Sequence, residues 1–167
     1  MNGQYNTSEN QDLGKQMNTL HIIWGAMLLS LLIYLFIIPA AGKNVKVTMP
    51  DDVLKKLRMA LYIIAVIELP LTRVIRKIVL SQKGAFTTRA GQLAPNPAVA
   101  RYQAAMVMSL ALSENIGIYG IVLYFIGKNK TDLYVLLLIA AAAMITYRPK
   151  QDEILMLSER QEKQGLA

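Results

Sequence analysis

The chain has 167 residues, of which 54% are hydrophobic, and its mean hydropathy is +0.34. It has a formal net charge of +7, no Cys and a single His, His21. The lack of Cys excludes disulfides and thiolate metal sites, and one His cannot supply a His-based metal cluster or a bis-His haem within one chain. Because long apolar runs alternate with short charged segments, the composition indicates an integral membrane protein rather than a soluble domain.

Four apolar segments are predicted to be transmembrane helices, so the predicted fold class is all-α and polytopic. They cover about residues 20–41, 54–80, 102–126 and 133–147. A helix needs about 20 apolar residues to cross ~30 Å of hydrocarbon. The fourth segment is shorter and spans only about 22 Å, so it needs a thinned bilayer or continuation into its flanks.

Polar segments flank this predicted transmembrane domain on both sides. Residues 1–19 are expected to form a disordered polar tail. The apolar run that follows is too long for a cleavable signal peptide, so it is expected to remain as a signal anchor. Residues 148–167 are expected to form a short amphipathic cytoplasmic tail, because Pro149 prevents a straight continuation of the fourth helix.

Basic residues are distributed unevenly between the two sides of the predicted membrane domain. With four spans, 11 Lys and Arg residues lie on the side of both termini and 7 on the other. This bias predicts a multi-pass protein of the inner (plasma) membrane with both termini in the cytoplasm. Between Glu68 and Glu114 there are six basic residues and no acidic one. The basic loop 81–98 is interpreted either as an ordinary loop near anionic lipid or as a docking surface for an acidic soluble partner.

The third segment has a small residue at every fourth position of one face, namely Ala105, Ser109, Ser113 and Gly117. Small residues let helix backbones approach closely in lipid, so this stripe is predicted to pack against another helix. The short connection 127–131 predicts a tight antiparallel hairpin, in which the run of four Ala residues at 140–143 provides a thin facing wall. The same surfaces are also suited to packing against other copies of the chain.

A carboxylate, Glu114, interrupts the third segment near its middle. An ionised acid at the centre of a bilayer costs on the order of 2.5–3.5 kcal/mol on insertion scales, and such residues often serve function. Desolvation favours the neutral form of a carboxyl group, so reversible protonation requires that water or a mobile charge reach it. Ser113, Asn115 and Tyr119 are nearby in sequence and are candidates to donate hydrogen bonds to Glu114.

Glu68, in the stretch AVIELPLTR, is a second acid near the middle of a predicted span. In an antiparallel arrangement Glu68 and Glu114 lie at similar depth, and two adjacent carboxyl groups would share a proton. The alternative for Glu68 is a structural ion pair with Arg73 or with a basic residue elsewhere.

The run ALSENIGIYGIVLYFI, residues 111–126, resembles the carboxylate-bearing helix of the rotor-ring c subunit of F-type ATP synthases and their V-type relatives. In that family a Glu in a small-residue context is followed five positions later by Tyr and six positions later by Gly. Here these positions are Glu114, Tyr119 and Gly120. The resemblance, which covers these 16 residues, implies that Glu114 carries a proton or ion and that Tyr119 helps to hold its carboxyl group.

These features predict a small membrane subunit that translocates protons or ions, with Glu114 as the carrier and Glu68 assisting. The alternative is a structural or assembly subunit of a membrane complex, whose buried acids serve only helix packing. The sequence contains no nucleophile and base motif, phosphate-binding loop or metal-ligand spacing, so we predict no enzyme activity, cofactor or metal site. The expected partners are membrane lipid and either other membrane subunits or further copies of the chain, and no nucleic acid.

The predicted topology has a direct test, because the natural chain contains no Cys. Single Cys residues introduced at Ser8, Thr87 and Ser158 should react with a membrane-impermeant thiol reagent only after the membrane is opened, since all three positions are predicted to be cytoplasmic. Labelling of any of them from outside intact cells would contradict the four-span orientation.

Overall fold

The computed structural model describes residues 5–42, 49–81 and 97–157, and most of the basic loop 81–98 therefore lies outside the described residues. The described chain is all-α, as predicted. Its four long helices are α1 (Tyr5–Ala41), α2 (Asp51–Ser81), α3 (Pro97–Gly127) and α4 (Lys130–Thr146), and a short helix, Gln151–Leu157, follows.

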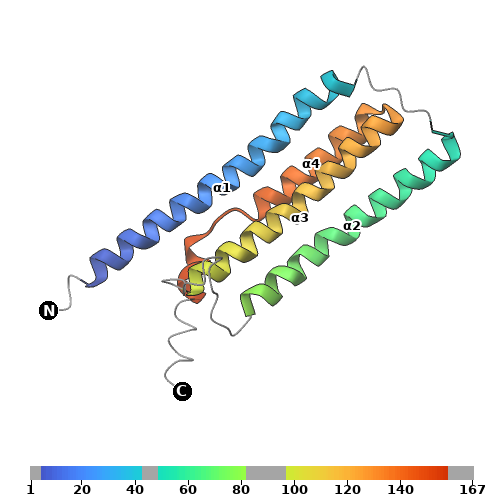
Figure 1. Ribbon diagram of the computed structural model, residues 1–167. Coiled ribbons are helices and arrows are strands. Elements are labelled where there is room, and N and C mark those ends of the chain that lie inside the picture. Colours follow the sequence, from blue (N-terminus) through green and yellow to red (C-terminus); the bar gives the residue numbers. More distant parts are fainter. Residues whose placement is uncertain (1–4, 43–48, 82–96, 158–167) are drawn as a thin grey trace, which may run out of the picture.

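The α3 and α4 helices form a central antiparallel pair, with α1 and α2 on opposite sides of it (Figure 1). The contact between α3 and α4 is the most extensive, followed by that between α2 and α3, whereas α1 packs more sparsely against α3 and α4. We call the end of the bundle where α3 joins α4 the hairpin end, and the opposite end, which carries Gln151–Leu157, the tail end (Figure 1).

The turn at the hairpin end needs only two residues, Lys128 and Asn129. Lys128 has a positive φ of 53°, and its backbone N–H donates to the Tyr124 carbonyl at 2.9 Å, which closes the last turn of α3. The Asn129 side chain then accepts from the Thr131 N–H at 2.9 Å and caps α4. Backbone groups at the end of α3 and at the start of α4 therefore have partners within the turn, and the two helices are antiparallel neighbours.

Glycine allows α3 to approach its neighbours closely. A Cβ on Gly117 would lie 3.1 Å from Leu31 of α1 and 3.2 Å from Leu137 of α4, so three helices meet at this residue. The small side chains at 105, 109 and 113 are also buried, with at most 1% of their surface exposed. The predicted stripe of small residues thus lies inside this chain, where it faces neighbouring helices.

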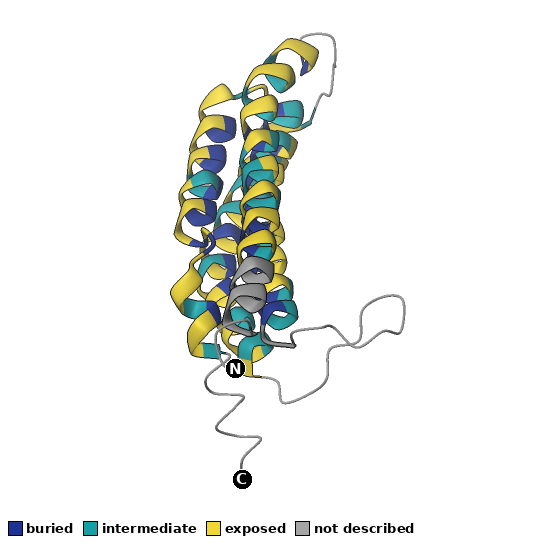
Figure 2. Cartoon of the chain, turned by 90° about the vertical axis from the view of Figure 1, so that its left-hand side faces the viewer, coloured by how far each residue is buried: buried dark blue, intermediate teal, exposed yellow. Residues whose placement is uncertain are grey.

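The middle of α2 turns polar residues into the bundle and exposes large apolar ones. Ala65, Glu68 and Thr72 are its buried residues. Large hydrophobic side chains cover the outer face, and those at least half exposed are Met59, Ile63, Val66, Ile67, Val74 and Ile78. Figure 2 shows the same pattern along the bundle, with buried residues where helices meet and exposed ones outside. In water this distribution would be unfavourable, because apolar surface is driven inward.

The α1 helix extends further towards the N-terminus than the apolar pattern predicts. Residues 1–19 are expected to be a disordered tail, but the helix begins at Tyr5. Adding residues to an existing helix is much easier than nucleating one, and the apolar span supplies the nucleus. Met17 and Leu20, at the junction of the two parts, are both buried, which fixes the helix against the core there.

Two described segments, Gly14–Ala41 and Val99–Gly127, are long and apolar enough to cross a membrane. Lys130–Thr146 and Gln151–Leu157 together count as a third if they form one span, although they are bent by 52° near Pro149. The predicted crossing by α2 does not follow from length and composition, because charged residues such as Glu68 interrupt its apolar middle.

The close approach of α3 and α4 predicts a destabilising effect at Gly120. In Gly120→Ala the new Cβ would lie 3.0 Å from the Leu136 Cβ and 3.2 Å from the Leu133 carbonyl oxygen, so the free energy of unfolding should fall by about 1–3 kcal/mol. Gly25→Ala is the matched control, because nothing lies within 4 Å of a Cβ there; it should stabilise the helix by roughly 0.5–1 kcal/mol. Unfolding of the purified protein in sodium dodecyl sulfate, followed by circular dichroism, measures both. Equal effects of the two substitutions would contradict the close approach.

Candidate functional site

The Glu114 carboxyl group lies at the interface of α3 with α1. Two hydroxyl groups from successive turns of α1 donate to its Oε1 atom, Ser30 Oγ at 3.0 Å and the Tyr34 hydroxyl at 3.2 Å. Ser30 also lies 2.7 Å from the Met27 carbonyl oxygen, so its hydroxyl hydrogen has two acceptors within reach. Glu114 is half-buried and sits near the middle of a 31-residue helix. It is thus held by neutral donors in the centre of the bundle.

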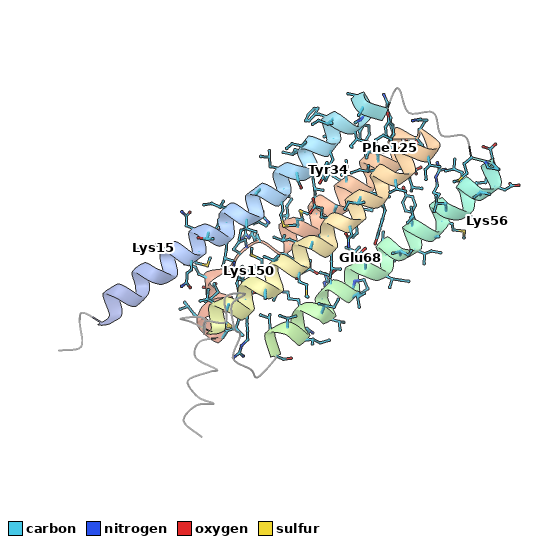
Figure 3. The ribbon with its side chains drawn as sticks, viewed as in Figure 1. Lys15, Tyr34, Lys56, Glu68, Phe125 and Lys150 are labelled. Atoms are coloured by element: carbon cyan, nitrogen blue, oxygen red, sulfur yellow. The ribbon has the colours of Figure 1, made fainter. Side chains whose placement is uncertain are left out.

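The Glu68 carboxyl group lies on the other side of α3. It projects from α2 and is 6% exposed, and its Oε1 atom accepts from Asn115 Nδ2 at 3.3 Å. The Tyr119 hydroxyl also interacts with this carboxyl group. The second oxygen, Oε2, is buried and has no hydrogen-bond partner among the described residues. Figure 3 shows Glu68 between α2 and α3, and Tyr34 on α1 beyond the central pair.

The three residues predicted to donate hydrogen bonds to Glu114 have other partners in the structure. Asn115 and Tyr119 are four residues apart and share a face of α3, but this face is turned towards Glu68. Consecutive helical residues point about 100° apart, so Asn115 cannot follow Glu114 to the α1 side. Ser113 donates instead to the Ser109 carbonyl oxygen at 2.8 Å. The hydroxyl contact that the rotor-ring resemblance implies for Tyr119 comes at Glu114 from Tyr34 of α1.

Glu68 and Glu114 consequently have separate partners and form two sites, one on each side of α3. The sequence predicts that the two carboxyl groups share a proton, but in the described residues they make no hydrogen bond with each other. The alternative ion pair of Glu68 with Arg73 is not formed either, since the ion pairs within the described ranges are Arg58 with Asp132 and Arg76 with Glu153.

A third polar cluster lies at the hairpin end. Arg58 of α2 pairs with Asp132 in the first turn of α4, with 2.7 Å between the guanidinium and Oδ2, and the Tyr62 hydroxyl donates to Oδ1 at 3.2 Å. The Asp132 side chain is 9% exposed and that of Arg58 is 37% exposed. Asp132 also lies at the positive end of the α4 dipole. This cluster ties α2 to α4 next to the turn.

A fourth cluster, at the tail end, is centred on Arg76 of α2. Its guanidinium pairs with Glu153 of the short helix and lies over two aromatic rings, 5.4 Å from the centre of Tyr102 and 5.6 Å from that of Tyr147. The Tyr102 hydroxyl, in turn, accepts from the Lys150 N–H at 2.8 Å. These contacts fix the segment after α4 against α2 and α3.

Sequence reasoning missed the two end clusters, although α2 carries a signal for them. Its inward face includes residues that recur every three or four positions, namely Arg58, Tyr62, Ala65, Glu68, Thr72 and Arg76. This is the period of one helix face, so the spacing alone places the polar members together on that face. Ser30 and Tyr34 form a similar pair, four residues apart, in the apolar run of α1.

The mid-helix acids differ chemically from the acids of the end clusters. Asp132 and Glu153 neutralise arginines, whereas Glu114 and Glu68 are held by hydroxyl and amide groups. A hydroxyl can donate to a carboxylate or accept from a protonated acid, so the Glu114 site suits both protonation states. Within the described residues, no group of three or more His, Cys, Asp or Glu side chains gathers into a metal site.

Compared with protein-family models, with curated proteins and with solved structures, the chain matches none of them. The likeness of residues 111–126 to the rotor-ring helix therefore stays a prediction.

The ion pair between Arg58 and Asp132 predicts that removing either charge lowers the stability of the protein. Removing both charges should restore part of that stability. Asp132→Asn leaves Arg58 without its partner and should lower the free energy of unfolding by about 1–3 kcal/mol, below the value for a fully buried pair because Arg58 is partly exposed. Arg58→Gln alone should cost a similar amount. The double variant should be more stable than the sum of the single effects predicts, and detergent unfolding curves measure all three. Strict additivity would show that the pair contributes nothing.

Proposed function

We propose that the chain is an inner-membrane protein with four spans that moves protons or another small cation through Glu114, with Glu68 as a second binding group. Both termini and the basic loop lie on the cytoplasmic side. It works as a subunit beside other membrane subunits or further copies of itself. The single observation that carries the proposal is the pair of mid-helix carboxyl groups held by neutral donors rather than by arginines.

The four-span placement is supported by the orientation of α2. A helix that buries Glu68 and Thr72 and exposes Val66, Ile67 and Val74 matches an apolar solvent, because lipid solvates the outer face and the bundle satisfies the polar one. The two arginine clusters lie near the ends of the bundle, where charged side chains approach the interfaces. The length of α4, 17 residues or about 25 Å, is close to the hydrocarbon thickness.

The carrier role is supported by two facts about the carboxyl groups. Neither is paired with an arginine among the described residues, and the partners that they have are neutral. A carboxylate paired with arginine stays ionised and cannot take up a cation without losing its partner. At Glu114 the partners are hydroxyl groups, whose hydrogens reorient when the acid gains or loses a proton. At Glu68 the Oε2 atom accepts no hydrogen bond from the described residues, and apart from Asn115 the neighbour of this carboxyl group is the neutral Tyr119 hydroxyl, so the site can accept a proton or a small cation.

The structural alternative is favoured by a different observation. Glu114 joins α1 to α3, and Glu68 joins α2 to α3, so each acid also holds two helices together. Interhelical hydrogen bonds of this kind typically contribute about 0.6 kcal/mol in membranes. Both roles require the hydrogen bonds, but only the carrier role requires that the carboxyl group exchange its proton.

The carrier role predicts that Glu114→Gln abolishes transport while the protein still folds. Glutamine keeps the shape and accepts from Ser30 and Tyr34 through its carbonyl oxygen, but it cannot be deprotonated. In vesicles that contain the purified protein and a pH-sensitive dye, proton flux should fall to the leak of empty vesicles. Glu114→Asp withdraws the acid by about one methylene and should leave partial flux, because transfer depends on geometry.

Asp52→Asn is the matched control, since it makes the same acid-to-amide change at an exposed residue in the first turn of α2, and it should leave flux unchanged. Full flux through Glu114→Gln would refute the carrier role. If Glu114→Gln is also fully stable while Glu114→Leu disturbs assembly, Glu114 is a packing residue.

A further inference from the structure

Two cavities lie side by side along α2 towards the tail end and share one residue, Arg73. The first, of about 340 Å³, is formed between α2 and the short helix Gln151–Leu157. The second, of about 360 Å³, is formed between α2 and α4. They differ in chemistry, since the first is lined by three basic residues and the second is apolar apart from Arg73 and the adjacent residues Thr146 and Tyr147 at the end of α4.

The basic cavity contains Arg73, Arg76 and Lys77, with Glu153 as its one acid. Glu153 is already paired with Arg76. Arg73 and Lys77 are both exposed, and neither has an acidic partner among the described residues. The lining of the cavity therefore carries a net positive charge, and neither Arg73 nor Lys77 forms an ion pair with a described residue.

The apolar cavity is a groove whose walls are formed by Leu69 and Pro70 of α2 and by Ile139, Ala142 and Ala143 of α4. The two alanines leave room between helices that make few direct contacts with each other. Arg73 stands at the point where this groove meets the basic cavity. An occupant of both must therefore be anionic at one end and apolar along the rest.

We propose that these two cavities form a binding site for one anionic phospholipid. The headgroup phosphate lies between Arg73 and Lys77, and an acyl chain runs along the α2 and α4 groove towards the middle of the bundle. The site rests on the membrane placement proposed above but not on ion transport. A soluble anion would occupy the basic cavity and leave the groove empty, and a zwitterionic lipid would not balance the unpaired charges.

Native mass spectrometry of the purified protein in a neutral detergent, titrated with phosphatidylglycerol, tests the proposal. The wild-type chain should retain one phosphatidylglycerol in preference to phosphatidylcholine. Removal of each basic side chain should weaken this binding about fivefold, and Arg73→Gln with Lys77→Gln about 30-fold. Lys56→Gln with Lys130→Gln is the matched control, because both lysines are exposed at the hairpin end and line neither cavity, and it should retain the lipid.

The groove has a test of its own. Ala142 is exposed, so Ala142→Leu should leave the helical content and unfolding curve unchanged while it fills the groove and weakens lipid retention. Displacement of the lipid by inorganic phosphate or by soluble glycerophosphoglycerol at equal concentration would overturn the proposal in favour of a soluble anion site. Equal retention of phosphatidylglycerol by the Arg73 and Lys77 double variant and by its control would overturn it entirely. Neither result bears on proton flux through Glu114.

Discussion

The arrangement of the bundle depends on one constraint, which is that the polar face of α2 must be covered. Along this face Arg58, Glu68 and Arg76 occur at the hairpin end, the middle and the tail end, and each meets a partner on another helix. A buried polar group without a partner is costly, so each of these contacts also fixes the rotation of α2. Many large apolar residues of α2 are left on the outside as a result, and the helix is held in the bundle by these polar contacts together with the leucines that pack on the core, such as Leu57, Leu61 and Leu69.

The position of α3 follows from the same constraint, because this helix supplies partners to both neighbours. Its glycines and small residues bring α4 close, and its Asn115 and Tyr119 face α2, while Glu114 faces α1. A single helix can do this because residues one position apart point in different directions, whereas residues four apart share a face. The sequence SENIGIYG thus encodes contacts with all three other long helices within about two turns.

The all-α class, the approximate helix positions and the polar residues at mid-helix were accessible from the sequence, because apolar run length and rare acids are strong local signals. The partners of Glu114 and Glu68 were not, since they depend on how each helix is rotated about its axis. Resemblance to a short helix placed Tyr119 with Glu114, but rotation turns Tyr119 towards Glu68 and brings Tyr34 from α1 instead. The N-terminal extension of α1 was missed for a related reason, since helix propagation from an apolar nucleus leaves no periodic trace in a polar segment.

The sparse packing of α1 bears on how Glu114 would exchange its proton under the proposed function. Ser30 and Tyr34 cover the Glu114 carboxyl group on the α1 side, so a proton or ion must enter where α1 and α3 separate or through water between them. Near the hairpin end α1 is anchored, since the Tyr124 hydroxyl donates to the Pro39 carbonyl at 3.3 Å and the Lys128 ammonium to that of Gly42 at 2.8 Å. Towards the tail end, Trp24 donates to the Met144 carbonyl at 3.0 Å. If α1 separates from α3 at Glu114, it must bend between these anchors, and the hydroxyl groups of Ser30 and Tyr34 would move with it.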